Sequence, residues 1–169
     1  MNIIIRKAQN GDESGLIKLF DGLDHETSFM LMEAGERKTS LEEQAAIIKS
    51  FEQATSRVLL VAQHQDNGEI IGFLGGTGGT ANRARHTLHI VVGVLKAYWG
   101  QAVGSQLVDA LILWARKHQF KRIEFTVMVH NKRAQRFYEH KGFEVEGIRR
   151  QALKVDGVFV DEVYMACLL

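Results

Sequence analysis

A segment in the middle of the chain combines a β-branched strand, a glycine-containing turn and the start of a helix. The strand is Ile90-Val91-Val92-Gly93-Val94, the turn covers 95–103, and Gly104-Ser105 open the helix. The first turn of a helix presents free backbone N–H groups and a partial positive charge, which together bind phosphate or pyrophosphate. Small residues let the backbone approach such an anion closely, and the segment offers Gly100, Ala102, Gly104 and Ser105. Residues 92–105 therefore predict a phosphate site. An ordinary strand-to-helix turn is the alternative, because short glycine motifs are weak signals.

Other chemistry-bearing residue types are sparse. The single Cys167 has no partner for an internal disulfide and no neighbours at zinc-ligand spacing, and the histidines are scattered. We therefore expect no metal site. Lys plus Arg number 21 and Asp plus Glu number 20, a balance that argues against a nucleic-acid partner. No apolar run approaches the roughly 20 residues that cross a bilayer, and no secretory signal is recognisable at the N-terminus. We expect a cytoplasmic protein that uses no membrane.

The elements that must position the phosphate segment follow from periodicity and caps. Ser40 with Glu43 forms a capping-box pattern, and Gly142 is a typical helix stop. Asp66-Asn67-Gly68 and Asp156-Gly157 indicate hairpin turns. Asn10 and Asp12 are candidate caps for the first helix, and 21–37 shows no clear period. The expected order is one strand, two helices, three strands, a helix, a strand, a helix and two strands.

This order predicts an α/β fold whose sheet is mixed and largely antiparallel in its first half. The length of 169 residues suits one domain with a full hydrophobic core, so we expect a single domain over 1–169. No repeat, low-complexity tract or linker interrupts the chain.

Two motifs carry a resemblance to the GNAT superfamily of N-acetyltransferases. The stretch from Val94 to Ser105 is similar to its acetyl-CoA signature, an Arg or Gln, two residues, Gly, one residue, then Gly or Ala. Gly104 matches the last position, whereas Trp99 stands where Arg or Gln is usual and Ala102 where the first Gly is usual. Ala102 then demands a backbone angle that a non-glycine residue can hold.

The second motif lies about 30 residues later, as the family requires. It is an Asn, an Ala three residues on, a Tyr four beyond that, then Gly-Phe, here Asn131, Ala134, Tyr138 and Gly142-Phe143. The final segment resembles the branch that contains ribosomal-protein N-terminal acetyltransferases and spermidine N-acetyltransferases. The resemblance implies a GNAT-like mixed, mostly antiparallel central sheet of about seven strands flanked by about four helices.

The resemblance also implies the site. Acetyl-CoA is the acetyl donor. The backbones of Val92 and Val94 meet its pantetheine arm as an added strand would, and Asn131 caps its helix or contacts the pantetheine. The pyrophosphate lies on the backbone of Gln101, Ala102, Val103, Gly104 and Ser105.

The implied reaction is a direct transfer in which a neutral amine attacks the thioester carbonyl. Tyr138 is the expected general acid for the leaving thiolate, and a backbone N–H near Val92 polarises the carbonyl oxygen. The family often places a Glu base where this chain has His89, whose intrinsic pKa near 6.5 suits a base at neutral pH. Glu124 on the neighbouring strand, or a water relay, is the alternative.

The acceptor site is expected between the loop of 21–37 and the final hairpin. Glu26, Glu33 and Glu36 there could attract a cationic amine, or could form a solvated acidic face. Arg37 either neutralises these carboxylates or binds a carboxylate of the acceptor.

The resulting hypothesis is an N-acetyltransferase that acts on a small-molecule amine, a polyamine or a peptide N-terminus. Members of the family are often homodimers, and the resemblance implies that assembly as an option for this chain. A non-catalytic CoA-binding sensor is the alternative. A Rossmann-type nucleotide fold fits poorly, because the glycine turn is central and the first half has no βαβ unit.

Overall fold

The computed structural model describes residues 2–169. Over that range the chain forms seven strands and four α-helices, in the predicted order. Their bounds are β1 (Ile3–Lys7), α1 (Glu13–Glu26), α2 (Leu41–Glu52), β2 (Arg57–His64), β3 (Ile70–Gly78), β4 (Thr87–Val94), α3 (Val103–Lys117), β5 (Arg122–Met128), α4 (Lys132–His140), β6 (Glu144–Val155) and β7 (Val158–Leu168). The predicted mixed α/β class is confirmed.

Local signals set several of the helix boundaries. Ser40 and Glu43 form the predicted capping box at the start of α2. Gly142 follows α4 with a φ of 87°, as expected for a helix stop. The start of α1 differs from the prediction: Asp12 occupies the cap position, but its side chain makes no cap hydrogen bond. Its carboxylate instead accepts hydrogen bonds from the Arg6 guanidinium at 2.7 and 2.8 Å, which ties β1 to α1.

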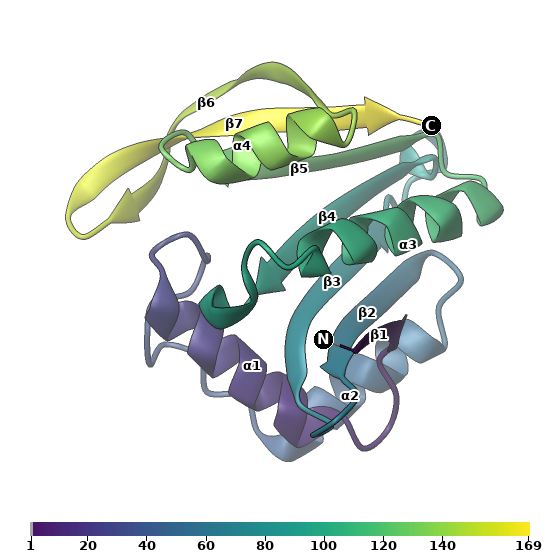
Figure 1. Ribbon diagram of the computed structural model, residues 1–169. Coiled ribbons are helices and arrows are strands. Elements are labelled where there is room, and N and C mark those ends of the chain that lie inside the picture. Colours follow the sequence, from purple (N-terminus) through teal and green to yellow (C-terminus); the bar gives the residue numbers. More distant parts are fainter. Residues whose placement is uncertain (1) are drawn as a thin grey trace.

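The seven strands that residues 2–169 contain form a sheet of order β1-β2-β3-β4-β5-β7-β6. Every neighbouring pair is antiparallel except β4 and β5, which run parallel, so the predicted mostly antiparallel sheet is confirmed. The β4–β5 pairing covers only Thr87–His89 against Arg122–Glu124. Beyond that point the two strands separate, as Figure 1 shows on the side away from the C-terminus. The sheet is therefore split between β4 and β5 from this point onward.

The two faces of the sheet carry separate cores. Val58 and Leu60 of β2 pack with the apolar face of α3, whereas Leu59 and Val61 pack with α1 and α2. This alternation follows from the two-residue period of a strand. The face that carries α3 and α4 and the face that carries α1 and α2 meet at the split between β4 and β5.

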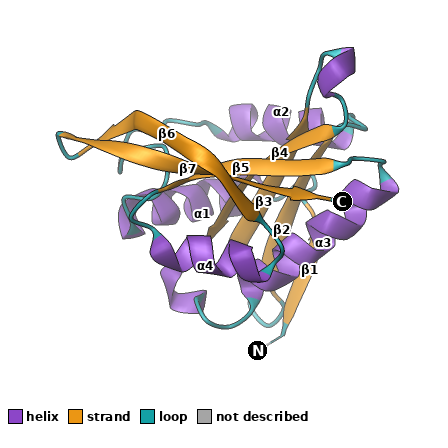
Figure 2. Ribbon diagram, turned by 90° about the horizontal axis from the view of Figure 1, so that it is seen from above, coloured by secondary structure: helices purple, strands orange, loops and turns teal. Residues whose placement is uncertain are grey.

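The last two strands form the predicted closing hairpin around Asp156-Gly157. Its register shifts twice, between Val145 and Gly147 and between Arg149 and Leu153. In both views the hairpin extends beyond the rest of the sheet (Figures 1 and 2). Over 2–169, none of the helices combines the length and the apolar character that a bilayer crossing requires.

Candidate active site

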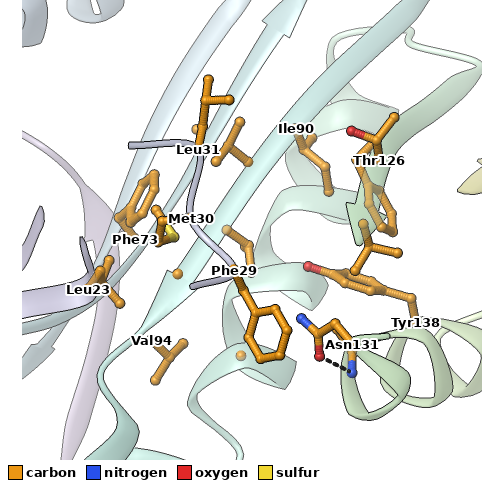
Figure 3. A pocket seen from close by; sticks show the side chains of 18 of the residues that line it. Leu23, Phe29, Met30, Leu31, Phe73, Ile90, Val94, Thr126, Asn131 and Tyr138 are labelled. Atoms are coloured by element: carbon orange, nitrogen blue, oxygen red, sulfur yellow. Dashed lines mark hydrogen bonds between the residues drawn. The ribbon is translucent and has the colours of Figure 1, made fainter. Parts of the chain in front are cut away.

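A cavity of about 1390 Å³ opens at the split between β4 and β5. Pockets for one small ligand usually measure roughly 300–1,000 Å³, so this one has room for more than one bound molecule. Residues from all four α-helices, from the six strands β2 to β7 and from the loops between them line it. In Figure 3, Leu23, Met30 and Phe73 lie on one side of the pocket and Thr126, Asn131 and Tyr138 on the other.

The edge of β4 that faces the split carries free backbone groups. Thr87 O accepts a hydrogen bond from Gly79 N, and Leu95 N donates to Ile71 O, both at 3.0 Å, so these odd-numbered residues face β3. Successive residues of a strand direct their N–H and C=O groups to opposite neighbours. The backbones of Val92 and Val94 therefore face the split, beyond the last β4–β5 pair. The two predicted residues thus offer a strand edge to a bound molecule.

The start of α3 lies at one end of the cavity. Its first intrahelical hydrogen bond runs from Gln106 N to Ala102 O at 3.0 Å, which leaves the amides of Val103, Gly104 and Ser105 without an intrahelical acceptor. These residues, Gly100 and Ala102 line the cavity. Gln101 does not; its side chain turns back and donates to Ala97 O at 3.0 Å.

Ala102 adopts a left-handed conformation, with φ at 62°. This costs an L-residue about 1–2 kcal/mol, which glycine avoids, while glycine adds unfolded-state entropy of about 0.4–1 kcal/mol. We therefore expect Ala102→Gly to raise the free energy of unfolding by about 0.5–1 kcal/mol. Urea denaturation measures the change. Ala110→Gly, inside the same helix, should instead lose about 1 kcal/mol, and a loss in both variants would contradict strain at residue 102.

Trp99, one of the two departures from the expected motif, is fixed in place. Its indole Nε1 donates to Val94 O at 2.7 Å. The Arg133 guanidinium lies 4.6 Å from the centre of the Trp99 ring, a cation–π contact. Among the described residues no carboxylate pairs with Arg133, whereas the nearby Lys141 is paired with Asp109 at 2.7 Å. Of the Arg and Lys side chains that line the cavity, Arg133 is therefore the one without a carboxylate partner within residues 2–169.

Tyr138 and Asn131 lie on the α4 side of the cavity (Figure 3). The Tyr138 ring is 7 % exposed and packs against Phe125 and Phe143. Burial raises the pKa of Tyr138, so its hydroxyl stays protonated at neutral pH. Asn131 accepts a hydrogen bond from Ala134 N at 3.2 Å, the predicted helix cap, while still lining the cavity.

The two predicted base candidates lie next to each other at the closed end of the split. His89 pairs in register with Glu124 across the last rung of β4 and β5. Glu124 accepts a 2.8 Å hydrogen bond from Arg122 Nε, and Arg122 also pairs with Glu146. These carboxylates raise the pKa of Arg122, so it remains charged. Glu124 is thus committed to an ion pair, whereas the exposed His89 is not.

A third proton acceptor, Glu162 on β7, was not predicted from the sequence. It is 7 % exposed and lines the cavity. Thr126 Oγ1 donates to its Oε1 at 3.2 Å and Arg149 Nη1 to its Oε2 at 2.9 Å. The sequence signal for this residue is weak: Glu162 is an acidic side chain at a position where every second residue of the strand is otherwise apolar or aromatic.

The loop between α1 and α2 covers the other side of the cavity. Phe29, Met30, Leu31 and Met32 line it, and Phe29 reaches His130 across the split, with ring centres 5.3 Å apart. At the far end, the buried Gln44 Nε2 has no hydrogen-bond partner within 2–169. It is available to an oxygen atom of a bound molecule.

The predicted acceptor residues on this loop are placed differently from the expectation. Glu33 and Glu36 are exposed and do not line the cavity; Glu36 accepts a hydrogen bond from Glu33 N at 2.8 Å. Glu26 accepts one from Lys96 N at 2.7 Å. Arg37 does line the cavity, but it pairs at 2.8 Å with the buried Asp24, not with the three glutamates. These contacts anchor the loop.

The chain matches the acetyltransferase (GNAT) family over residues 22–143. A comparison with curated protein sequences finds no match. A GNAT-family acetyltransferase from Streptococcus pneumoniae shares 26 % identity and superposes with a TM-score of 0.94, covering 99 % of this chain and 100 % of that one.

Two further solved structures share the fold. A putative acetyltransferase from Salmonella typhimurium, solved with its cofactor acetyl-CoA, is 20 % identical with a TM-score of 0.87, covering 100 % of this chain and 95 % of that one. A ribosomal-protein-alanine N-acetyltransferase from Brucella melitensis is 22 % identical with a TM-score of 0.85, covering 98 % and 99 % of the two chains.

Proposed function

Because the chain belongs to the acetyltransferase (GNAT) family, we propose that it transfers the acetyl group of acetyl-CoA directly to a primary amine. The observation that carries the proposal is the split between β4 and β5, which leads from the first turn of α3 to the buried Tyr138. A long, thin donor with phosphates at one end and a thioester at the other fits such a path.

The residues along the path suit this donor. The amides of Val103, Gly104 and Ser105 would hold the pyrophosphate, and the Val92 backbone would pair with the pantetheine amides. Val94 O already accepts the Trp99 indole N–H, so Val92 is the main strand-edge contact. Bound there, acetyl-CoA supplies the activated acetyl group.

We propose that Arg133 supplies the positive charge that faces the phosphates. Residues 99–105, which lead into the first turn of α3, contain no cationic side chain of their own. Arg133→Gln is expected to weaken acetyl-CoA binding about 10-fold, since one hydrogen bond to a charged group contributes about 1.5–3 kcal/mol. Calorimetric titration at low salt measures the affinity. Arg136→Gln, on the same helix but outside the cavity, is the matched control; equal affinity in both variants would argue against the assignment.

In the reaction, the Val92 N–H polarises the thioester carbonyl and the Tyr138 hydroxyl gives its proton to the leaving sulfur. The amine must lose a proton, because an alkylamine with a pKa near 10.4 is mostly protonated at neutral pH. His89, Glu124 and a water relay are the candidates from the sequence.

The part of the cavity that we assign to the acceptor lies between the α1–α2 loop and the β6–β7 hairpin. Apolar side chains such as Phe29 and Leu31 line it on the loop, and polar ones such as Thr126 and Glu162 line it on the strands. We propose that it takes a primary amine with an apolar portion, as a peptide N-terminus or an amine-bearing small molecule has. The single domain and the homodimer remain predictions.

The testing experiment measures thiol release from acetyl-CoA by the purified protein with separate amines: spermidine, benzylamine, L-leucinamide and an Ala-initiated hexapeptide. Release that depends on the amine supports the proposal, and mass spectrometry identifies the N-acetyl product. Acetyl-CoA binding without release for any amine would favour the non-catalytic sensor.

A further inference from the structure

We propose that Glu162 is the carboxylate that takes the proton from the attacking amine, held in position by Thr126 and Arg149. The inference rests on the proposed function, because it assigns one step of that reaction to a residue on β7.

Strand register brings Glu162 level with the reacting end of the split. His89 and Glu124 are opposite each other in the last β4–β5 pair. Val92 lies three residues beyond His89, while Thr126 and Met128 lie two and four residues beyond Glu124. Met128 pairs with Glu162 on β7. The Thr126–Glu162 pair is thus level with the Val92 amide, across the split from it, and His89 lies toward the closed end.

The same register puts these side chains on one face. Residues paired across neighbouring strands share a face, and Thr126 shares it with Met128 two positions on. Glu162 pairs with Met128 on one side and with Arg149 on the other. This is the face of the α1–α2 loop, where the acceptor enters. Figure 3 shows the Thr126 and Tyr138 side chains on the same side of the pocket.

The contacts of Glu162 leave it able to accept a proton. Each carboxylate oxygen receives one hydrogen bond, from Thr126 and from Arg149, whereas a carboxylate has about four acceptor sites. The Arg149 guanidinium compensates the charge of a side chain that is only 9 % exposed. No comparable contact orients His89 among the described residues, and Glu124, which is also paired with an Arg, lies with His89 in the last β4–β5 pair at the closed end of the split.

The amine attacks in its neutral form, after its ammonium proton has passed to solvent. Its nitrogen forms a bond to the acetyl carbon while the carbonyl π electrons move to the oxygen; the nitrogen becomes more acidic, and its proton passes to a Glu162 oxygen. The carbon–sulfur bond then breaks, the sulfur receives the Tyr138 proton, and CoA and the amide leave. Glu162 returns its proton to solvent and Tyr138 regains one.

The experiment compares the steady-state kinetics of E162Q, E162D, H89Q and E144Q, using whichever of the four amines named above the wild type acetylates fastest. Gln has the shape of Glu: its amide oxygen can accept from Arg149 while its NH2 group donates to the Thr126 hydroxyl, so the fold should persist. E144Q removes an exposed carboxylate of β6 that is outside the cavity. We expect E162Q to lower kcat by about 100-fold or more with the KM for acetyl-CoA unchanged. E162D should recover part of the loss, and E144Q should retain wild-type kcat.

Three results would overturn the inference: E162Q with the kcat of E144Q, E162Q with a raised amine KM but unchanged kcat, or a large kcat loss in H89Q alone. The first two leave the proposed function intact. A wild-type protein that releases no CoA with any of the four amines would instead overturn the proposed function, and this inference with it.

Discussion

Replacing Tyr138 by Phe is expected to lower kcat by about 100-fold or more, within the range that a positioned general acid contributes. The KM for acetyl-CoA should change little. The hydroxyl that is removed makes no hydrogen bond to another described residue, while the ring that stays packs against Phe125 and Phe143. The substitution therefore removes a proton donor without opening a cavity in the core.

The pH dependence of the wild type provides a second check. A general acid works only while protonated, so kcat falls as pH rises through its pKa. Burial raises the pKa of Tyr138 above the usual value near 10, so any decline due to this group should begin only above about pH 10. A decline near pH 8 that is absent from Tyr138→Phe would contradict this environment.

Tyr164→Phe is the matched control, because Tyr164 also lines the cavity but is 43 % exposed on β7. It should keep most of the wild-type kcat. Thermal unfolding of both variants checks that neither change disturbs the fold. Equal kcat in the two variants would remove the acid role from Tyr138.

The order of the elements was predictable because each signal is local. The capping box at Ser40 and the stop at Gly142 depend on residues that are close in the chain. At Ala102 the sequence required only a backbone angle that a non-glycine residue can hold, and the left-handed φ of 62° is a finding of the structure. The segment that we propose to bind the cofactor is visible in the sequence for the same reason: strand, turn and helix start follow one another directly.

Features that depend on distant residues were not predictable. The split in the sheet exists because β4–β5 pairing ends at His89 and Glu124, and a single sequence does not encode where a parallel pair stops. The place of Glu162 depends on the register of three strands, and β6 carries two bulges. Arg37 was expected beside three glutamates, whereas burial makes Asp24 its partner.

The positive charge that we assign to the phosphate site also depends on residues that are distant in the sequence. The motif places an Arg or Gln at position 99, where this chain has Trp. We propose that the replacement charge comes from Arg133 on α4, which contacts the Trp99 ring from another element. Only the tertiary structure brings the two side chains together.

Gly104→Val should produce the opposite kinetic result to Tyr138→Phe. Gly104 lies in the first turn of α3, and a Cβ added there would meet Phe137 at 3.7 Å and Val94 at 3.9 Å, which are ordinary contacts. A methyl group therefore fits, but the branched Val side chain extends into the space where the pyrophosphate would approach the amides. The loss of two hydrogen bonds to a charged group, about 3 kcal/mol, corresponds to about 100-fold weaker acetyl-CoA binding.

The chemistry should survive this change, because Tyr138 and Glu162 lie on other elements. We expect the KM for acetyl-CoA to rise while kcat at saturating donor stays near the wild-type value. Gly104→Ala supplies the graded comparison: its single methyl should cost much less affinity than the Val side chain. Thermal unfolding separates binding from stability, since Val and Gly differ by only about 0.5 kcal/mol in helix propensity. A folded Gly104→Val variant that binds acetyl-CoA as tightly as the wild type would move the pyrophosphate away from α3, and a variant that loses kcat instead of affinity would mean that this turn serves the reaction rather than the cofactor.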